Sequence, residues 1–136
     1  DVLIIFMGPH SYISPSWYAQ SPGVPTWNYS AVHAYGKVSL LNDTQTLEVV
    51  EEVVNKYEPD LLVKRDIITD EFRDKLLSGI VGFKIEISDI ECKLKLGQQR
   101  KAEDQSGVYN ALLNSSDFDA QSLAQHMKKL SVGTGS

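Results

Sequence analysis

The part of the chain that most constrains its fold is VPTWNYSAVHAYG, which runs from Val24 to Gly36. Its side chains alternate in two sets, with Trp27, Tyr29, Ala31, His33 and Tyr35 in one set and Asn28, Ser30, Val32 and Ala34 in the other. A repeat of two residues is the spacing of a β-strand. The pattern therefore predicts a long strand that continues to about Leu41. Gly36 marks a bulge in it or the close approach of another backbone.

Aromatic and polar side chains gather in this strand and in the segment before it, GPHSYISPSWY (Gly8 to Tyr18). Both tryptophans, four of the six tyrosines and two of the three histidines lie between these limits. Ser14, Ser16 and Asn28 add hydroxyl and amide groups, so the region is suited to hold a flat, polar ring. The competing interpretation is that the aromatic side chains belong to the core, as most do.

Length and composition indicate one globular domain with a core of its own. The chain has 136 residues, of which 42% are hydrophobic and 23% charged. Its formal net charge of −5 disfavours general binding to nucleic acids. Cys92 has no second cysteine to pair with, and the longest apolar run, Val2 to Met7, is too short to cross a bilayer. We therefore expect a cytoplasmic protein.

The run from Val2 to Met7 has the continuous apolar character of a strand buried on both faces. Because such a strand needs neighbours on both sides, we expect that the chain lacks a segment upstream. Gly8-Pro9 interrupts the run, and a short separate strand is predicted at Ser11–Ile13. Ser21 to Pro25 is predicted to be a loop.

Two helices are predicted after the long strand. The first begins at a cap on Asn42 or Thr44 and ends before Pro59. A linker from Asp60 to Ile68 leads to the second, which begins at Thr69 or Asp70 and ends at Gly82.

The rest of the chain returns to strand and then to helix. Phe83–Ser88 alternates apolar and polar residues, and Ile90–Leu96 extends this strand or pairs with it. Two further helices are predicted at Val108–Leu113 and Ala120–Leu130. The element order predicts an α+β fold with mainly antiparallel strands and peripheral helices.

Familiar enzyme signatures are absent from the sequence. It contains no glycine-rich nucleotide loop, no HExxH and no nucleophile elbow. Its histidines lie on separate elements without acidic or cysteine neighbours at ligand spacing, so we predict no metal site. Lys93, Lys95 and Arg100 form the densest basic cluster, which either binds a phosphate or carboxylate or guards an exposed strand edge.

Four segments resemble the PaiB family, described as FMN-binding negative transcriptional regulators. They are GPHSYISPSWY, VPTWNYSAVHAYGKV, IVGFKIEISDIECKLKLGQQR and AEDQSGVYNAL. The resemblance runs from Leu3 to about Leu113. It implies a split β-barrel of the pyridoxamine-phosphate-oxidase-like kind over residues 1–113, followed by a helical tail over residues 114–136. It also implies a homodimer with FMN in clefts between subunits, and an upstream segment that supplies the first barrel strands and much of the phosphate contact.

The resemblance also assigns the cofactor-binding residues and no catalytic residue. The ISPSWY and PTWNY motifs and the KxKLSQN-like segment carry over to Ser14, Ser16, Trp17, Tyr18, Thr26, Trp27, Asn28, Lys93, Lys95, Gln98 and Arg100. This chain departs from that last pattern at Gly97, which replaces serine, and at Gln99, which replaces asparagine.

Two functional classes remain open. The family favours a bacterial FMN-binding regulator. Such a regulator either contacts DNA through a basic patch, formed by residues Lys93 to Lys101 and Lys128-Lys129, or acts through a partner protein. The alternative is a flavin-dependent oxidoreductase acting on a small molecule, which needs few catalytic side chains of its own.

Overall fold

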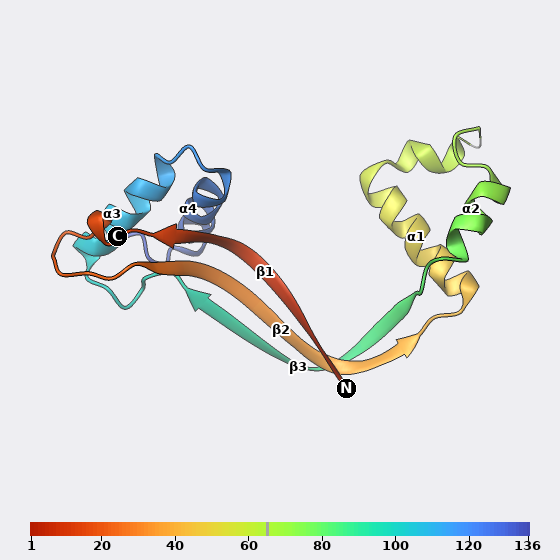
Figure 1. Cartoon of the computed structure of the whole chain (residues 1–136), viewed down its shortest axis with the longest axis horizontal. Coiled ribbons are helices and arrows are strands. Elements are labelled where there is room, and N and C mark those ends of the chain that lie inside the picture. The colour runs from red at the N-terminus through yellow and green to blue at the C-terminus, as the bar shows by residue number, and fades with distance from the viewer. Residues whose placement is uncertain (65) are drawn as a thin grey trace. The chain divides into compact units, whose positions relative to one another are not determined.

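The computed structural model describes residues 1–64 and 66–136. Its elements are β1 (Val2–Ile13), η1 (Pro15–Trp17), β2 (Thr26–Leu40), α1 (Asp43–Tyr57), η2 (Pro59–Val63), α2 (Asp70–Leu77), β3 (Phe83–Lys95), α3 (Ala102–Leu113) and α4 (Phe118–Leu130), where η denotes a 3-10 helix. The strands form one antiparallel sheet in the order β1-β2-β3 (Figure 1). The α+β class is confirmed, and the described residues form an open sheet with no closed barrel.

The strands are longer and fewer than predicted. β1 continues through Gly8-Pro9, so the separate strand at Ser11–Ile13 was wrong. Pro9 is tolerated because β1 lies at a sheet edge, where the missing N–H of a proline breaks no hydrogen bond between strands. Gly8 is needed for a different reason: a Cβ there would collide with the side chain of Ser30 on β2. β3 is likewise a single strand.

β1 was also predicted to be buried on both faces, and this was wrong for the described residues. It pairs with β2 alone, and its side chains at Leu3, Ile5, Phe6 and Met7 are between 45% and 59% exposed. Within the described residues β1 is therefore an edge strand. The close backbone approach predicted at Gly36 is confirmed, because a Cβ there would meet the carbonyl oxygen of Glu86 on β3.

The structure confirms the predicted caps of α1 and α2 and the predicted ends of α3 at Leu113 and of α4 at Leu130. Asn42 caps α1 in a capping box with Gln45, and Thr69 caps α2. α2 ends at Leu77 instead of Gly82, and η2 lies in the predicted linker, of which residue 65 is outside the described residues. α3 begins six residues earlier than predicted, and Glu103 and Asp104 place negative charge in its first turn, where the helix dipole favours it.

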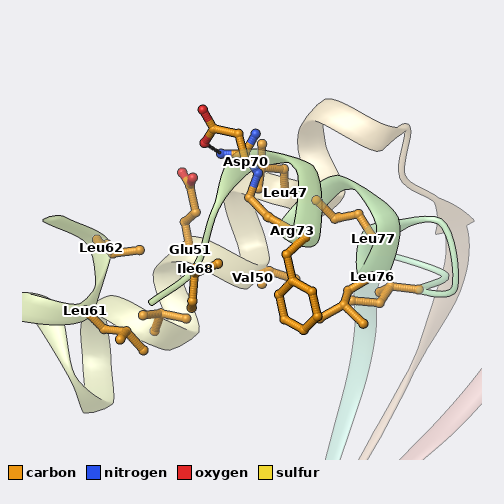
Figure 2. Close-up of a pocket in the computed structure, with 13 residues that line it drawn as sticks. Leu47, Val50, Glu51, Leu61, Leu62, Ile68, Asp70, Arg73, Leu76 and Leu77 are labelled. Carbon is orange, nitrogen blue, oxygen red and sulfur yellow. Dashed lines mark hydrogen bonds and ion pairs between the residues drawn. The ribbon is translucent and has the colours of Figure 1, made fainter. Parts of the chain in front are cut away.

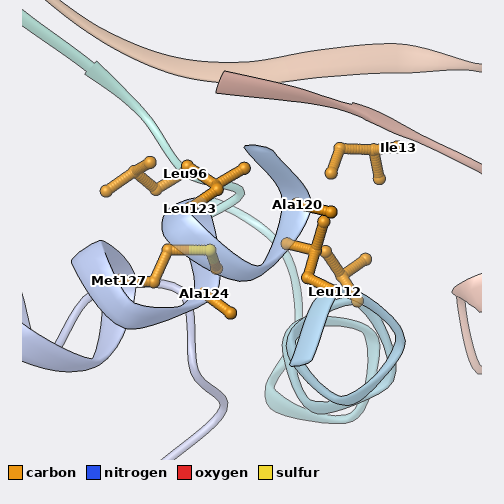
Figure 3. Close-up of a cluster of buried hydrophobic side chains, with 8 residues drawn as sticks. Ile13, Leu96, Leu112, Ala120, Leu123, Ala124 and Met127 are labelled. Atoms are coloured by element: carbon orange, nitrogen blue, oxygen red, sulfur yellow. The ribbon is translucent and has the colours of Figure 1, made fainter. Parts of the chain in front are cut away.

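The described residues divide into two compact units. Unit 2 comprises residues 3–34 and 89–136 and holds the buried core (Figure 3). Its fully buried side chains include Ile13 from β1, Leu112 from α3 and Leu123 from α4. The boundary predicted at residue 113 falls inside this unit, between α3 and α4.

Unit 1 comprises residues 1–2 and 35–88 and contains α1, η2 and α2. Thr46 is buried in α1, where its hydroxyl donates to the carbonyl oxygen of Asn42 at 2.8 Å. Many apolar side chains of this unit stay half-exposed, among them Phe72 and Leu76. None of the helices in the described ranges has the length and apolar character that crossing a bilayer requires.

Candidate functional site

A cavity of about 120 Å³ lies within unit 2, between the start of β2, the end of β3, the turn after it and α3. We call it the β2–β3 cavity. Five of the predicted site residues line it: Tyr18, Thr26, Asn28, Lys95 and Arg100. Chain segments as far apart in sequence as Ile13 and Gly133 therefore meet at one small site.

Lys95 and Thr26 join the two strands at the cavity wall. The Lys95 Nζ atom donates to Thr26 Oγ1 at 2.6 Å. An ammonium group has three N–H donors, so this bond leaves others for a ligand. Asn28 follows Thr26 on the same face of β2, and it is only 3% exposed although it lines the cavity.

Arg100 is fixed by an aromatic ring and a carboxylate. Its Cζ atom lies 3.7 Å from the centre of the Tyr18 ring, a cation–π contact, and its Nη1 atom lies 3.7 Å from Asp104 Oδ2. The Tyr18 ring covers only the flat face of the guanidinium. The N–H groups in the plane of the guanidinium therefore remain available to an anion. Asp104 also accepts a hydrogen bond from the backbone N–H of Ala19 at 2.9 Å, which anchors the segment after Tyr18.

Ser14, Ser16 and Trp17 build the η1 turn that presents Tyr18. Ser14 Oγ accepts a hydrogen bond from the backbone N–H of Ser16 at 3.2 Å, and the two hydroxyls lie 2.7 Å apart. Trp17 packs on the buried cluster of unit 2. These three residues directly precede Tyr18 in the chain, and they do not line the cavity.

The turn between β3 and α3 places Arg100. The backbone N–H of Arg100 donates to the carbonyl oxygen of Gly97 at 2.9 Å, and Gly97 has a φ of 77°, a conformation that glycine adopts at little cost. Gln98 Oε1 accepts from the N–H of Leu96 and its Nε2 donates to the carbonyl of Leu94, both at 2.7 Å. Gln98 thus holds the turn by its amide, and does not line the cavity.

Trp27 and Lys93 lie away from the cavity. Trp27 is 52% exposed and contacts the rings of His10 and Tyr12, with centroids 6.1 and 6.3 Å away. Lys93 lines an open depression with Tyr29, His33 and the exposed Cys92. The predicted residues therefore fall into three groups: cavity wall, supporting turns and separate surface.

Sequence reasoning missed three polar residues that line the cavity: Gln99, Asp104 and Gln105. Asp104 follows Arg100 by four residues, a spacing that favours ion pairs on helices and could have indicated it. Gln105 donates from Nε2 to the carbonyl of Arg100 at 2.7 Å and accepts at Oε1 from the N–H of Gly135 at 3.3 Å. No pattern in the sequence pointed to Gln105, because its partners come from the turn and from the chain end.

Charge and volume limit what this cavity holds. Lys95 and Arg100 outweigh Asp104 by one positive charge, which suits an anion. Pockets that enclose a whole cofactor usually measure roughly 300–1,000 Å³, well above this volume. The cavity fits a group of phosphate size, and a flavin ring system would have to lie outside it. No group of three or more potential metal-ligating side chains occurs in residues 1–64 and 66–136.

A family model described as a putative FMN-binding domain matches residues 1–89. The chain belongs to this FMN-binding domain family. The match contains Tyr18, Thr26 and Asn28, whereas Lys95 and Arg100 follow its end.

Similar proteins extend the relationship beyond the matched domain. The chain is 42% identical over 130 residues to the protease synthase and sporulation protein PAI 2 of Bacillus subtilis, covering 94% of this chain and 62% of that protein. This confirms the resemblance to the PaiB family. Uncharacterized proteins of Emericella nidulans and Aspergillus fumigatus are 29% and 30% identical. The chain spans 53% and 50% of their lengths, so it corresponds to only part of each relative.

Proposed function

We propose that the chain binds FMN with the flavin phosphate in the β2–β3 cavity, and that it acts in the cytoplasm as a negative transcriptional regulator of the PaiB kind. One observation carries the proposal: Lys95 and Arg100 flank a phosphate-sized cavity in a chain of the FMN-binding domain family. Arginine and lysine beside polar neutral groups are the usual partners of a phosphate monoester.

The small volume of the cavity supports a shared flavin site. If the phosphate occupies the β2–β3 cavity, the ring system extends beyond it and needs a second wall. We infer that this wall belongs to a partner subunit in a homodimer whose sheets complete a split barrel. Size-exclusion chromatography with light scattering checks the oligomeric state, and a monomer that binds FMN would contradict the inference.

One observation favours the regulator over the oxidoreductase. The name of the Bacillus subtilis relative includes the word sporulation, which denotes a cellular process and not a single reaction. Bleaching of bound flavin by a nicotinamide donor would favour the oxidoreductase instead. A gel shift with the native promoter at physiological salt determines whether the chain contacts DNA directly or acts through a partner.

The phosphate assignment is tested by comparing FMN with riboflavin, which lacks the phosphate. Titration followed by quenching of flavin fluorescence should show FMN binding at least about tenfold more tightly, since hydrogen bonds to charged groups contribute roughly 1.5–3 kcal/mol each. Lys95→Gln and Arg100→Gln should each remove most of that preference and leave riboflavin affinity unchanged.

Lys93→Gln is the matched control, because it removes the same charge from the same strand outside the cavity. It should leave the preference for FMN almost intact. Equal affinities for the two flavins, or an equal loss in Lys93→Gln and Lys95→Gln, would refute the assignment.

A further inference from the structure

Unit 1 contains a larger cavity of a different character. It measures about 400 Å³ and lies between α1, η2 and α2 (Figure 2). We call it the helical cavity. Its volume falls within the range of pockets that hold small organic molecules. All the residues that line it belong to unit 1, so it is separate from the β2–β3 cavity.

The lining of the helical cavity is mostly aliphatic. Leu47, Val50 and Val54 recur at three- and four-residue spacings on α1 and so share one face of that helix. Leu76 and Leu77 from α2 and Ile68 from the segment before it contribute further apolar surface. Such a lining favours the apolar body of a ligand because its burial removes hydrocarbon from water.

Three charged side chains stand together at one side of the helical cavity, as Figure 2 shows for Glu51, Asp70 and Arg73. Asp70 and Arg73 form an ion pair with each other, and Glu51 is the other carboxylate among the lining residues. The arrangement therefore resembles an apolar pocket with an acidic rim.

The guanidinium of Arg73 is already committed to carboxylates. Its Nη1 atom lies 3.0 Å from Asp70 Oδ1 and its Nη2 atom 2.8 Å from Asp74 Oδ1, with Nε donating to the same Asp74 oxygen at 3.0 Å. The hydrogen bond to Asp74, together with the charges of Asp74, Asp70 and Glu51, raises the pKa of Arg73 above its ordinary value. Arg73 is thus poorly placed to attract a further anion, and the half-buried Glu51 is the acidic group to which a cation can bind.

We propose that the helical cavity binds a small amphipathic cation, with its apolar body among the aliphatic side chains and its protonated amine against Glu51. This ligand is opposite in charge to the flavin phosphate and occupies a different unit. The proposal therefore does not depend on FMN binding, and flavin titration of the same sample tests the two separately.

The experiment uses three probes that share a phenylbutyl body: 4-phenylbutylamine, 4-phenylbutanol and 4-phenylbutyrate. Each is titrated into the ¹⁵N-labelled 136-residue chain, and amide chemical shifts are followed by NMR. The amine should bind about three- to tenfold more tightly than the alcohol, the range of a partly exposed ion pair, and the carboxylate should bind most weakly. The shifts should concentrate in α1 and α2.

Variants separate the charge of the rim from the volume of the cavity. Glu51→Gln should bring the amine's affinity down to that of the alcohol and leave the alcohol's affinity unchanged. Glu48→Gln, on an exposed position of the same helix outside the cavity, is the matched control and should keep the amine preference. Val50→Phe should weaken all three probes because the larger side chain fills the space.

Wild-type-like amide spectra show that each variant is folded. The proposal is overturned if no probe binds at millimolar concentration or if the three probes bind equally. It is also overturned if the shifts lie outside α1 and α2, or if Glu51→Gln and Glu48→Gln behave alike.

Discussion

Gly107 lies inside α3, where a glycine normally weakens a helix relative to alanine by about 1 kcal/mol. A Cβ at this position would collide with the backbone carbonyl oxygen of Trp17. A backbone atom cannot move aside as a flexible side chain can, and such overpacking costs roughly 1–3 kcal/mol. The steric cost therefore exceeds the gain in helix propensity.

We expect Gly107→Ala to lower the free energy of unfolding by about 1 kcal/mol, measured by urea denaturation. Gly79→Ala is the control, because the nearest atom to its added Cβ is the carbonyl oxygen of Leu76 at 3.5 Å, an ordinary contact. That variant should be neutral or slightly more stable. A Gly107→Ala protein as stable as the wild type would show that α3 and η1 are not packed this closely.

Single residues also mark where sequence reasoning reached its limit. Lys93 and Lys95 are two residues apart, so strand alternation alone would place them on the same face. They nevertheless line different cavities, because Lys95 is the last residue of β3 and its side chain reaches Thr26 on β2. Gly97 departs from the family pattern, which has serine at this position. The positive φ of Gly97 is a conformation that glycine adopts more readily than serine.

Among the elements, α4 depends on a single side chain for its start. Asp117 Oδ1 accepts hydrogen bonds from the N–H groups of Asp119 at 2.7 Å and Ala120 at 3.3 Å. α4 contributes Leu123, Ala124 and Met127 to the buried cluster, so a weakened start affects the core of unit 2.

Asp117→Ala should destabilise the protein by about 1 kcal/mol and lower the Tm by a few degrees, since two N–H groups lose their acceptor. Thermal unfolding followed by circular dichroism measures this change. Asp117→Asn keeps a capping oxygen and should retain most of the stability. If alanine and asparagine cost the same, the cap contributes through its charge and not through these hydrogen bonds.

The starts of α1 and α2 could be predicted from sequence because their caps are local. Asn42 and Thr69 cap α1 and α2 as expected, each through a side chain and an N–H group three residues later. The extent of the strands could not be predicted equally well, because pairing partners decide it. Gly8-Pro9 is a break in sequence terms, yet β1 passes through it beside Ser30.

At the scale of the whole molecule, burial is unevenly distributed. The fully buried large side chains of the described residues, such as Leu112 and Met127, belong to unit 2, whereas in α1 and α2 the buried residue is Thr46. Local opening costs least where few apolar contacts are buried. Unit 1 should therefore open more readily than unit 2.

Hydrogen exchange followed by mass spectrometry tests this difference in the 136-residue chain. Peptides from α3 and α4 should exchange markedly more slowly than peptides from α1 and α2. 4-Phenylbutylamine should slow exchange in α1 and α2 if it binds the helical cavity, since a ligand stabilises the state that holds it. Equal protection of the four helices in the free chain would contradict the expected difference.

The candidate site was also only partly predictable from the sequence, because contacts between distant segments decide which side chains meet. The family resemblance supplied Tyr18, Thr26, Asn28, Lys95 and Arg100 together, and the structure brings them to one cavity. It also supplied Trp27 and Lys93, which lie elsewhere, because a motif does not say which of its side chains share a wall. The helical cavity was not predicted, since an apolar helix face looks the same in sequence whether it encloses a core or a pocket.

The path of the last residues matters to anyone who purifies this chain. Gly133 borders the β2–β3 cavity, and the N–H of Gly135 donates to Gln105, so residues 133–135 pass close to the cavity wall. An affinity tag fused after Ser136 would begin within a few residues of this cavity. A polyhistidine tag there would add imidazole groups that compete for anions. Flavin affinities should therefore be measured with a tag at the other end or after its removal.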